Sequence, residues 1–222
     1  APSKWNVAAM VNPVDLSESL DDRARSYLAA NCAHCHRRGG GGTVPADLSF
    51  STDRSQMNVI DAEPSQGAFG ITNAKVVAPG SPLNSTMFYR MATSGSGHMP
   101  KLGIGDNDRA GLQLIYQWIE SLGNPATASR TRIDVDASET SVALKRFSDL
   151  LFGEDMTQKQ LEAVARKQQT LGSPLIADLF ERFLPIQDRR QRLGNRIDRE
   201  ALLEMTGDAT RGRERFLDGQ SM

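Results

Sequence analysis

The sequence predicts an all-α protein in two parts, and three observations lead to this fold class. Apolar residues recur at helical spacing in several segments. Ser, Thr or Pro stands where these segments begin, and Gly where some of them end. The first part is rich in loops, Gly and Pro, whereas the second is charged and helically periodic. We expect a domain over residues 1–125, a linker over 126–135 and a helical region over 136–222.

Two helices are expected before residue 100. The first covers 21–31, with Tyr27 and Leu28 on its inner side. The second covers 81–93, where Ser81 is the expected N-cap and Pro82 occupies the first helical position, at which a missing N–H costs nothing. The long stretch between them has little periodicity. Such a loop is unusual in a compact domain unless it wraps something large, such as a cofactor.

A third helix is expected over 106–123, ending at Gly123. In the second part, Thr157 and Ser173 are expected N-caps, and Pro174 follows at a first helical position. The expected helices there cover 136–153, 157–172, 173–185 and 198–206. The residues expected in the helix cores are Leu112, Ile115, Ile119, Leu122, Leu144, Phe147, Leu151, Leu179, Phe180 and Phe183.

Composition excludes several classes of function. The formal net charge is -1, which argues against nucleic acid as a partner because binding it requires clustered positive charge. No run of about 18 apolar residues is present, so no transmembrane segment is predicted. The chain has two cysteines, too few for a disulfide scaffold, and they stand three positions apart.

The segment CAHCH, from Cys32 to His36, fits three chemistries. A structural zinc ion would need two ligands besides Cys32 and Cys35, and the remaining candidates are histidines. A thiol–disulfide oxidoreductase would place the pair after a strand, at the start of a helix, and no such pattern surrounds it. The third is covalent haem c attachment, in which both thiols form thioethers and the imidazole of His36 is the proximal iron ligand. The sequence favours one covalent haem c.

A haem that only carries electrons needs a sixth iron ligand, and the sequence offers several. Met99 lies in the glycine-flanked segment GSGHMPKLG, where its thioether can turn inward, and it is the favoured ligand. His98 is an alternative, and an open position is another. Methionines within helices are more often part of the core. The other candidates are Met57, Met87 and Met91.

The sequence also offers interpretations of the four glycines after the motif and of three arginines. The four glycines at 39–42 lack the Lys-Ser/Thr of a phosphate-binding loop, so we expect them to give the chain freedom around the cofactor. Arg37 and Arg38 could neutralise haem propionates and Arg90 could point toward the haem pocket, but exposure at the surface is favoured for all three.

The order of these motifs resembles class I cytochrome c. The segments RARSYLAANCAHCHRRGGGG, VVAPGSPLNSTMFYRM, HMPKLG and LIYQWIESLG are similar to the cytochrome c modules of planctomycete-type multidomain secreted proteins, over roughly residues 20–123. The resemblance implies a class I cytochrome c fold, Met99 as distal ligand, and a periplasmic or exported location. It implies electron transfer rather than enzymatic turnover, with a dehydrogenase or another cytochrome as redox partner.

The C-terminal part carries a second resemblance. Its last 45 or so residues are similar to the lead-in to a second haem-binding domain, which would begin at about residue 207 with GDATRGRERF. A second CxxCH is then expected beyond Met222. Two other functions stay open: a haem enzyme or gas or redox sensor with an open or weakly held sixth position, and a helical scaffold whose haem is vestigial.

Overall fold

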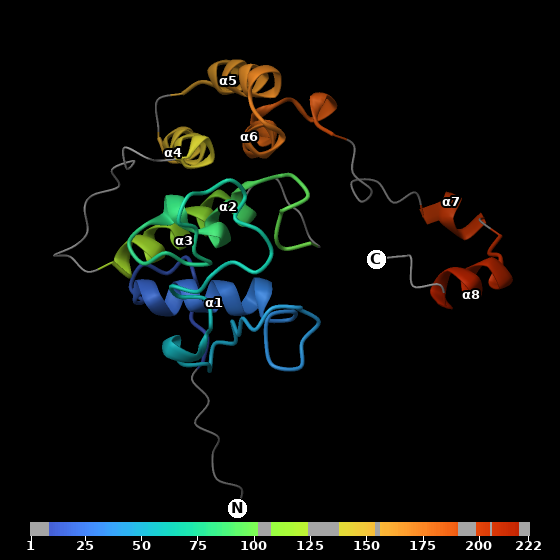
Figure 1. Cartoon of the computed structure of the whole chain (residues 1–222), viewed down its shortest axis with the longest axis horizontal. Coiled ribbons are helices and arrows are strands. Elements are labelled where there is room, and N and C mark those ends of the chain that lie inside the picture. The colour runs from blue at the N-terminus through green and yellow to red at the C-terminus, as the bar shows by residue number, and fades with distance from the viewer. Residues whose placement is uncertain are drawn as a thin grey trace, which may run out of the picture. The chain divides into compact units, whose positions relative to one another are not determined.

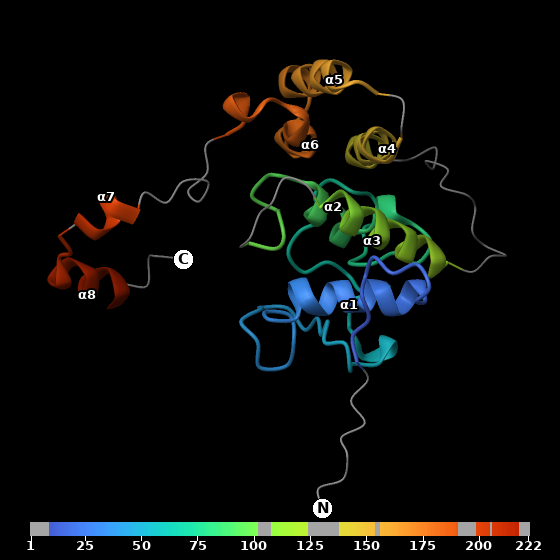
Figure 2. The ribbon, with the colours of Figure 1, turned by 180° about the vertical axis from the view of Figure 1, so that it is seen from behind.

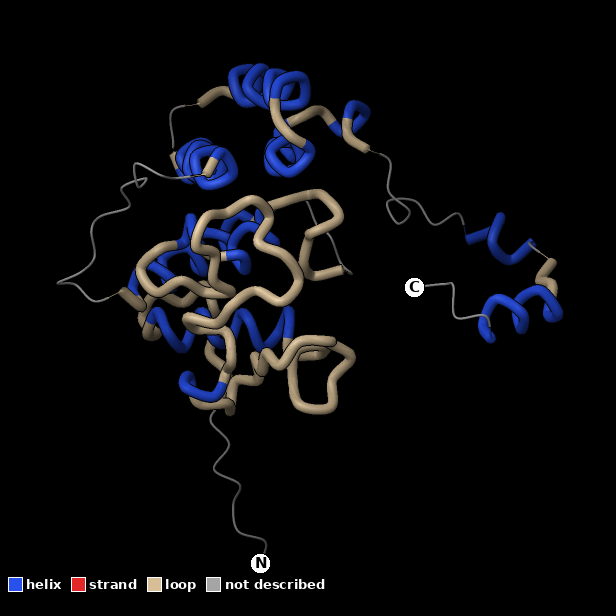
Figure 3. The backbone as a smooth tube through the Cα atoms, viewed as in Figure 1, coloured by secondary structure: helices blue, strands red, loops and turns tan. Residues whose placement is uncertain are grey.

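The computed structural model describes residues 9–101, 108–123, 138–153, 156–190, 199–204 and 206–217. Over these residues the chain consists of helices and loops, with only the isolated bridges Ile60–Val77 and Lys75–Ser85 in place of sheet structure (Figures 1 and 3). The predicted all-α class is confirmed. Contacts divide the chain into two compact units, Ala1–Gln187 and Asp188–Met222.

Helix α1 spans Leu20–Cys32 and agrees with the predicted helix to within one residue. Ser19 begins it, because its hydroxyl accepts a hydrogen bond from the backbone N–H of Asp22 at 3.1 Å. Leu28 is buried, as expected for the inner side of the helix, whereas Tyr27 is only half-buried; Ala24 is buried as well. The helix therefore ends at the first cysteine of the CxxCH motif.

The predicted helix over 81–93 is wrong in its first turn. Residues Pro82–Asn84 form the 3-10 turn η2, and helix α2 covers only Thr86–Ala92. Ser85 is extended between them, because its hydroxyl accepts from the N–H of Ala78 at 2.9 Å and donates to the carbonyl of Ser81 at 2.9 Å. The carbonyl of Ser81, which would accept from the Ser85 N–H in a continuous helix, accepts from the Ser85 hydroxyl instead.

Helix α3 spans Arg109–Ser121 and packs against α1. Trp118 is fully buried and its indole N–H donates to the carboxylate of Asp21 at 2.8 Å. A Cβ on Gly111 would lie 2.5 Å from the ring of Tyr27, so a glycine is required at this helix crossing. The expected stripe is confirmed for Leu112, Ile115 and Ile119, which are buried, while Leu122 is half-buried.

The long segment between α1 and α2 is ordered by the core rather than by its own periodicity. Met57, Val59 and Val77 are almost completely buried. Four non-glycine residues take left-handed backbone angles, among them Phe69 at φ 53°. Such a conformation costs a bulky residue about 1–2 kcal/mol, so tertiary contacts must hold it.

Helices α4 (Glu139–Phe152), α5 (Gln158–Leu171) and α6 (Pro174–Phe180), followed by the 3-10 turn η3 (Glu181–Phe183), form what we call the α4–α6 layer. The layer lies on the side of α2 and α3 that faces away from α1 (Figures 1 and 2). Its predicted core is confirmed: Leu144, Phe147, Leu151, Leu179, Phe180 and Phe183 are all buried.

The starts of these helices match the sequence in part. Thr157 forms a capping box with Gln160, as an N-cap should. Ser173 precedes α6 and Pro174 is its first residue, although the hydroxyl of Ser173 makes no capping bond. The predicted helix over 173–185 changes to a 3-10 turn after Phe180, so its α-helical part is shorter than expected.

The second unit contains helices α7 (Arg199–Glu204) and α8 (Ala209–Leu217). Asp208 begins α8 with a hydrogen bond from the N–H of Arg211 to its carboxylate at 2.9 Å. A helix thus starts close to residue 207, where a second haem-binding domain is expected. The identity of that domain stays a prediction, as does the division at residues 125 and 135, because residues 124–137 lie outside the described part of the chain.

Candidate functional site

The CxxCH motif folds back on the last turn of α1. The backbone N–H groups of Cys35 and His36 both donate to the carbonyl of Cys32, at 3.1 and 2.9 Å. Cys32 and His36 are half-buried, whereas Cys35 is exposed. The motif therefore forms one compact turn that presents two thiols and an imidazole from adjacent positions.

The glycines after the motif pack over it. The N–H of Gly42 donates to the carbonyl of Cys35 at 3.0 Å, and a Cβ on Gly40 would lie 2.4 Å from the same oxygen. The N–H of Leu48 donates to the carbonyl of His36 at 2.8 Å. We expected these glycines to give the chain freedom around a cofactor. At Gly40 and Gly42 this expectation is wrong, because close contact with the backbone is what requires glycine there.

The imidazole of His36 has the properties of a metal ligand. Among the described residues, its buried Nδ1 has no hydrogen-bond partner. Burial, and then the positive charge of Arg90, lower the pKa of His36 below its usual value. A lowered pKa favours the neutral form of the ring, which is the form that coordinates metals.

The cysteines do not resemble a redox-active pair. Burial, and then the charge of Cys35, raise the pKa of Cys32 to about 11. Thiol–disulfide oxidoreductases depend on a cysteine whose pKa is lowered, because the thiolate is the nucleophile. A neutral Cys32 thiol argues against the oxidoreductase alternative.

Met99 lies in a loop over residues 93–101, which we call the Met99 loop. Its backbone N–H donates to the carbonyl of Arg90 at 2.9 Å, and the Met99–Pro100 peptide bond is cis. Its side chain is partly exposed. The alternative methionines are part of the core: Met57 is 1% exposed, and Met87 and Met91 pack against buried residues.

His98 stands beside Met99 and is also oriented by a hydrogen bond. Its Nδ1 lies 2.6 Å from the carbonyl oxygen of Thr93. A carbonyl can only accept, so this contact places the proton on Nδ1 and leaves Nε2 as the potential ligand atom. His98 and Met99 therefore stay the two candidates that the sequence offered for a sixth ligand.

Arg90 contacts both parts of the site, although the sequence favoured a surface position for it over one that points toward the pocket. Its guanidinium acts on the charge of His36, its carbonyl holds Met99, and it lies 5.2 Å from the ring centroid of Phe69. Burial lowers the pKa of Arg90, in contrast to the exposed position expected for it. Its place two residues before the end of α2, ahead of the Met99 loop, was the available signal.

Cys32, Cys35 and His36 share one turn at the end of α1, and Met99 and His98 lie on a loop whose backbone is hydrogen-bonded to Arg90. Among the described residues, no group of three or more His, Cys, Asp or Glu side chains could hold a metal ion. No described helix has the length and apolar character needed to cross a membrane. Comparisons with family models, curated proteins and solved structures yield no match.

Proposed function

We propose that this chain is an electron-transfer protein with a class I cytochrome c fold and one covalent haem c. The observation that carries the proposal is the turn at the end of α1. It presents both cysteines of the chain and a neutral imidazole within five residues, under a glycine loop that packs on the same backbone. The raised pKa of the Cys32 thiol argues against thiol–disulfide exchange, the other chemistry of a CxxC pair.

Each site residue has a separate task in this proposal. Cys32 and Cys35 form the thioethers, His36 supplies the proximal nitrogen, and Met99 supplies the distal sulfur. Haem bound in this way passes one electron at a time, and methionine–histidine ligation raises its reduction potential. The positive charge of the Arg90 guanidinium would favour the reduced form of the site, because that form carries less positive charge.

The proposal extends to location and partners. Covalent attachment of haem c takes place outside the cytoplasm in the family that the sequence resembles, so we place the protein in the periplasm or outside the cell. Its redox partner would be a dehydrogenase or another cytochrome, either separate or within the same polypeptide.

Optical spectra of the protein, produced in a host that attaches haem c, test the proposal. Ferric protein should show the weak far-red band of methionine bound to iron. Met99→Ala should abolish this band, while His98→Ala should retain it. Loss of the band in His98→Ala but not in Met99→Ala would contradict the ligand assignment.

Two further measurements separate the competing functions. Replacement of Cys32 and Cys35 by Ala should abolish covalent haem in a denaturing gel. Wild-type protein that binds carbon monoxide rapidly in the ferrous state would instead favour the sensor or haem enzyme with an open sixth position. Slow or absent reduction by a small electron donor would favour the vestigial haem.

A further inference from the structure

The α4–α6 layer contacts the Met99 loop directly. The backbone N–H of Ser94 donates to the carbonyl of Asp178 in α6 at 2.9 Å. The hydroxyl of Ser94 lies 2.7 Å from the same carbonyl oxygen and 2.5 Å from a carboxylate oxygen of Glu181. Asp178 and Glu181 are both buried, at 9% and 3% exposure, so water does not compete effectively for these bonds.

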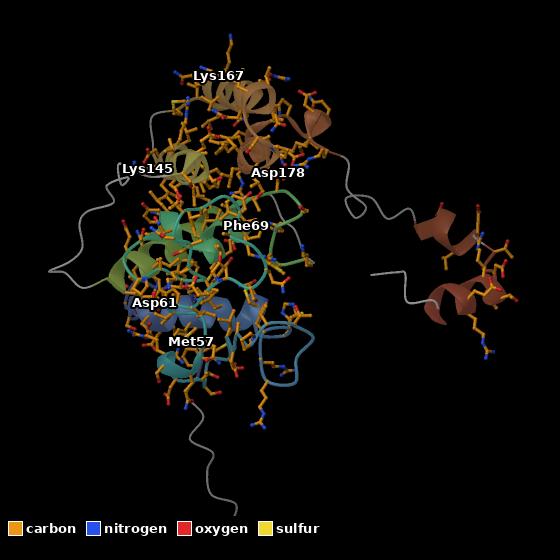
Figure 4. All side chains as sticks on the ribbon, in the orientation of Figure 1. Met57, Asp61, Phe69, Lys145, Lys167 and Asp178 are labelled. Atoms are coloured by element: carbon orange, nitrogen blue, oxygen red, sulfur yellow. The ribbon has the colours of Figure 1, made fainter. Side chains whose placement is uncertain are left out.

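The loop approaches the layer so closely that a side chain is excluded. A Cβ on Gly95 would lie 1.6 Å from a carboxylate oxygen of Asp178. Two residues later, a Cβ on Gly97 would lie 2.7 Å from the ring of Phe69. Gly95 therefore packs against α6, and Gly97 packs against the ring of Phe69. Figure 4 labels Phe69 and Asp178.

Phe69 contacts helix α2 directly and is linked through it to helix α6. Its ring stacks on Tyr89 with centroids 4.9 Å apart, and the guanidinium of Arg90 lies over it. The hydroxyl of Tyr89 donates to the carbonyl of Leu175 in α6 at 3.0 Å. Tyr89 thus links Phe69, whose backbone is left-handed, to α6, the helix that also contains Asp178.

We propose that Ser94, Asp178 and Glu181 form a clamp through which the α4–α6 layer positions the Met99 loop and keeps Met99 on the iron. This inference rests on the proposed function, and it gives the layer a role in ligand retention instead of that of a linker. Ser94, Asp178 and Glu181 act as positioning residues, since they act through the backbone of the loop. An external ligand can bind iron only when the loop opens, so a weaker clamp should increase the apparent affinity for that ligand.

Imidazole binding to the ferric, haem-loaded protein measures the clamp. Ser94→Ala and Glu181→Ala each remove a hydrogen bond to a buried group. We expect each to tighten apparent imidazole binding about tenfold. Glu181→Gln retains an acceptor oxygen and should stay within about threefold of wild type, which is the rescue expected if the hydrogen bond matters.

A matched control separates the clamp from a general loss of stability. Ser148 is a buried serine of the same layer whose hydroxyl donates to the carbonyl of Leu144 within α4, at 2.8 Å. Ser148→Ala should lower the free energy of unfolding in urea by about as much as Ser94→Ala does. It should nevertheless leave imidazole affinity unchanged. A similar increase in imidazole affinity in Ser148→Ala would overturn the proposal.

Hydrogen exchange followed by mass spectrometry gives a readout independent of the iron. The amides of Ser94 and Met99 are both hydrogen-bonded, so the peptide over 93–101 should exchange about tenfold faster in Ser94→Ala than in wild type. Peptides from α1 should be unaffected. Unchanged exchange and unchanged imidazole affinity, in protein whose far-red band depends on Met99, would refute the clamp and leave the proposed function standing.

The reverse failure is also distinguishable. If Met99→Ala retains the far-red band, the ligand assignment is wrong. The part of the proposal that concerns ligand retention then fails; faster exchange over 93–101 in Ser94→Ala supports only the positioning of the loop by the layer, and unchanged exchange refutes that as well.

Discussion

Phe147→Ala tests whether the α4–α6 layer and the first half of the chain unfold as one unit. Phe147 is fully buried in α4 and packs on the rings of Phe180 and Phe183, with centroids 6.2 and 5.8 Å away. The layer shares a core with α2 and α3; for example, Phe152 of α4 lies 5.5 Å from Tyr116 of α3. Damage at Phe147 should therefore reach helix α3.

The expected magnitude follows from the cavity that the substitution creates. Truncation of a buried Phe to Ala lowers the free energy of unfolding by about 3–5 kcal/mol. With a urea dependence of about 2–3 kcal/mol/M for a unit of this size, the midpoint should fall by about 1–2 M. Trp118 in α3 is fully buried and reports this transition. A Trp5→Phe background makes it the only tryptophan.

The assay compares Trp118 fluorescence with far-ultraviolet circular dichroism in urea. Both signals should shift together in Phe147→Ala. Leu171→Ala, at a position in α5 that is 73% exposed, serves as the control and should change the free energy by less than about 0.5 kcal/mol. If the Trp118 midpoint stays in place while part of the helical signal is lost earlier, the layer unfolds separately. The predicted boundary near residue 125 would then divide two independent domains.

The remaining predictions concern helix contacts. Burial, and then its hydrogen bond to Asp108, raise the pKa of Tyr27 above its usual value of about 10, so stability is complete below pH 10 and falls as the pH rises further. Tyr27→Phe should flatten this decline in urea midpoints between pH 8 and 11, and an equal slope would contradict the assignment. Gly111→Ala should lower the free energy of unfolding by about 1–3 kcal/mol, because the clash with Tyr27 outweighs a gain of about 1 kcal/mol in helix propensity. Thr157→Ala should cost about 1 kcal/mol, and no change in the urea midpoint would show that its capping box with Gln160 is not formed.

Local signals in the sequence were sufficient for most helices. Thr157 begins α5 with the expected cap, and the apolar spacing in α4 and α6 placed Leu144, Phe147 and Leu179 in the core. These features depend on residues within one or two turns of each other. They could be predicted because helical periodicity and capping are short-range properties.

Interactions between distant residues account for the errors. The helix expected from Ser81 is interrupted at Ser85, which pairs with Lys75 and accepts from Ala78. Arg90 was expected at the surface, but the aromatic ring beneath it belongs to Phe69. Neither contact can be predicted from the periodicity of the sequence, because both join segments that meet only after folding.

The two sides of the candidate site differ in the same respect. His36 is positioned by Cys32 and by glycines that follow it within a few residues, so this side could be predicted from one short motif. The Met99 loop is instead held by Ser94 against Asp178, more than 80 positions further along the chain. Under the proposed function, substitutions in the α4–α6 layer should therefore change retention of the sixth ligand, while haem attachment at Cys32 and Cys35 would stay complete. Haem content and the far-red band then report separately on the local and the long-range parts of one site.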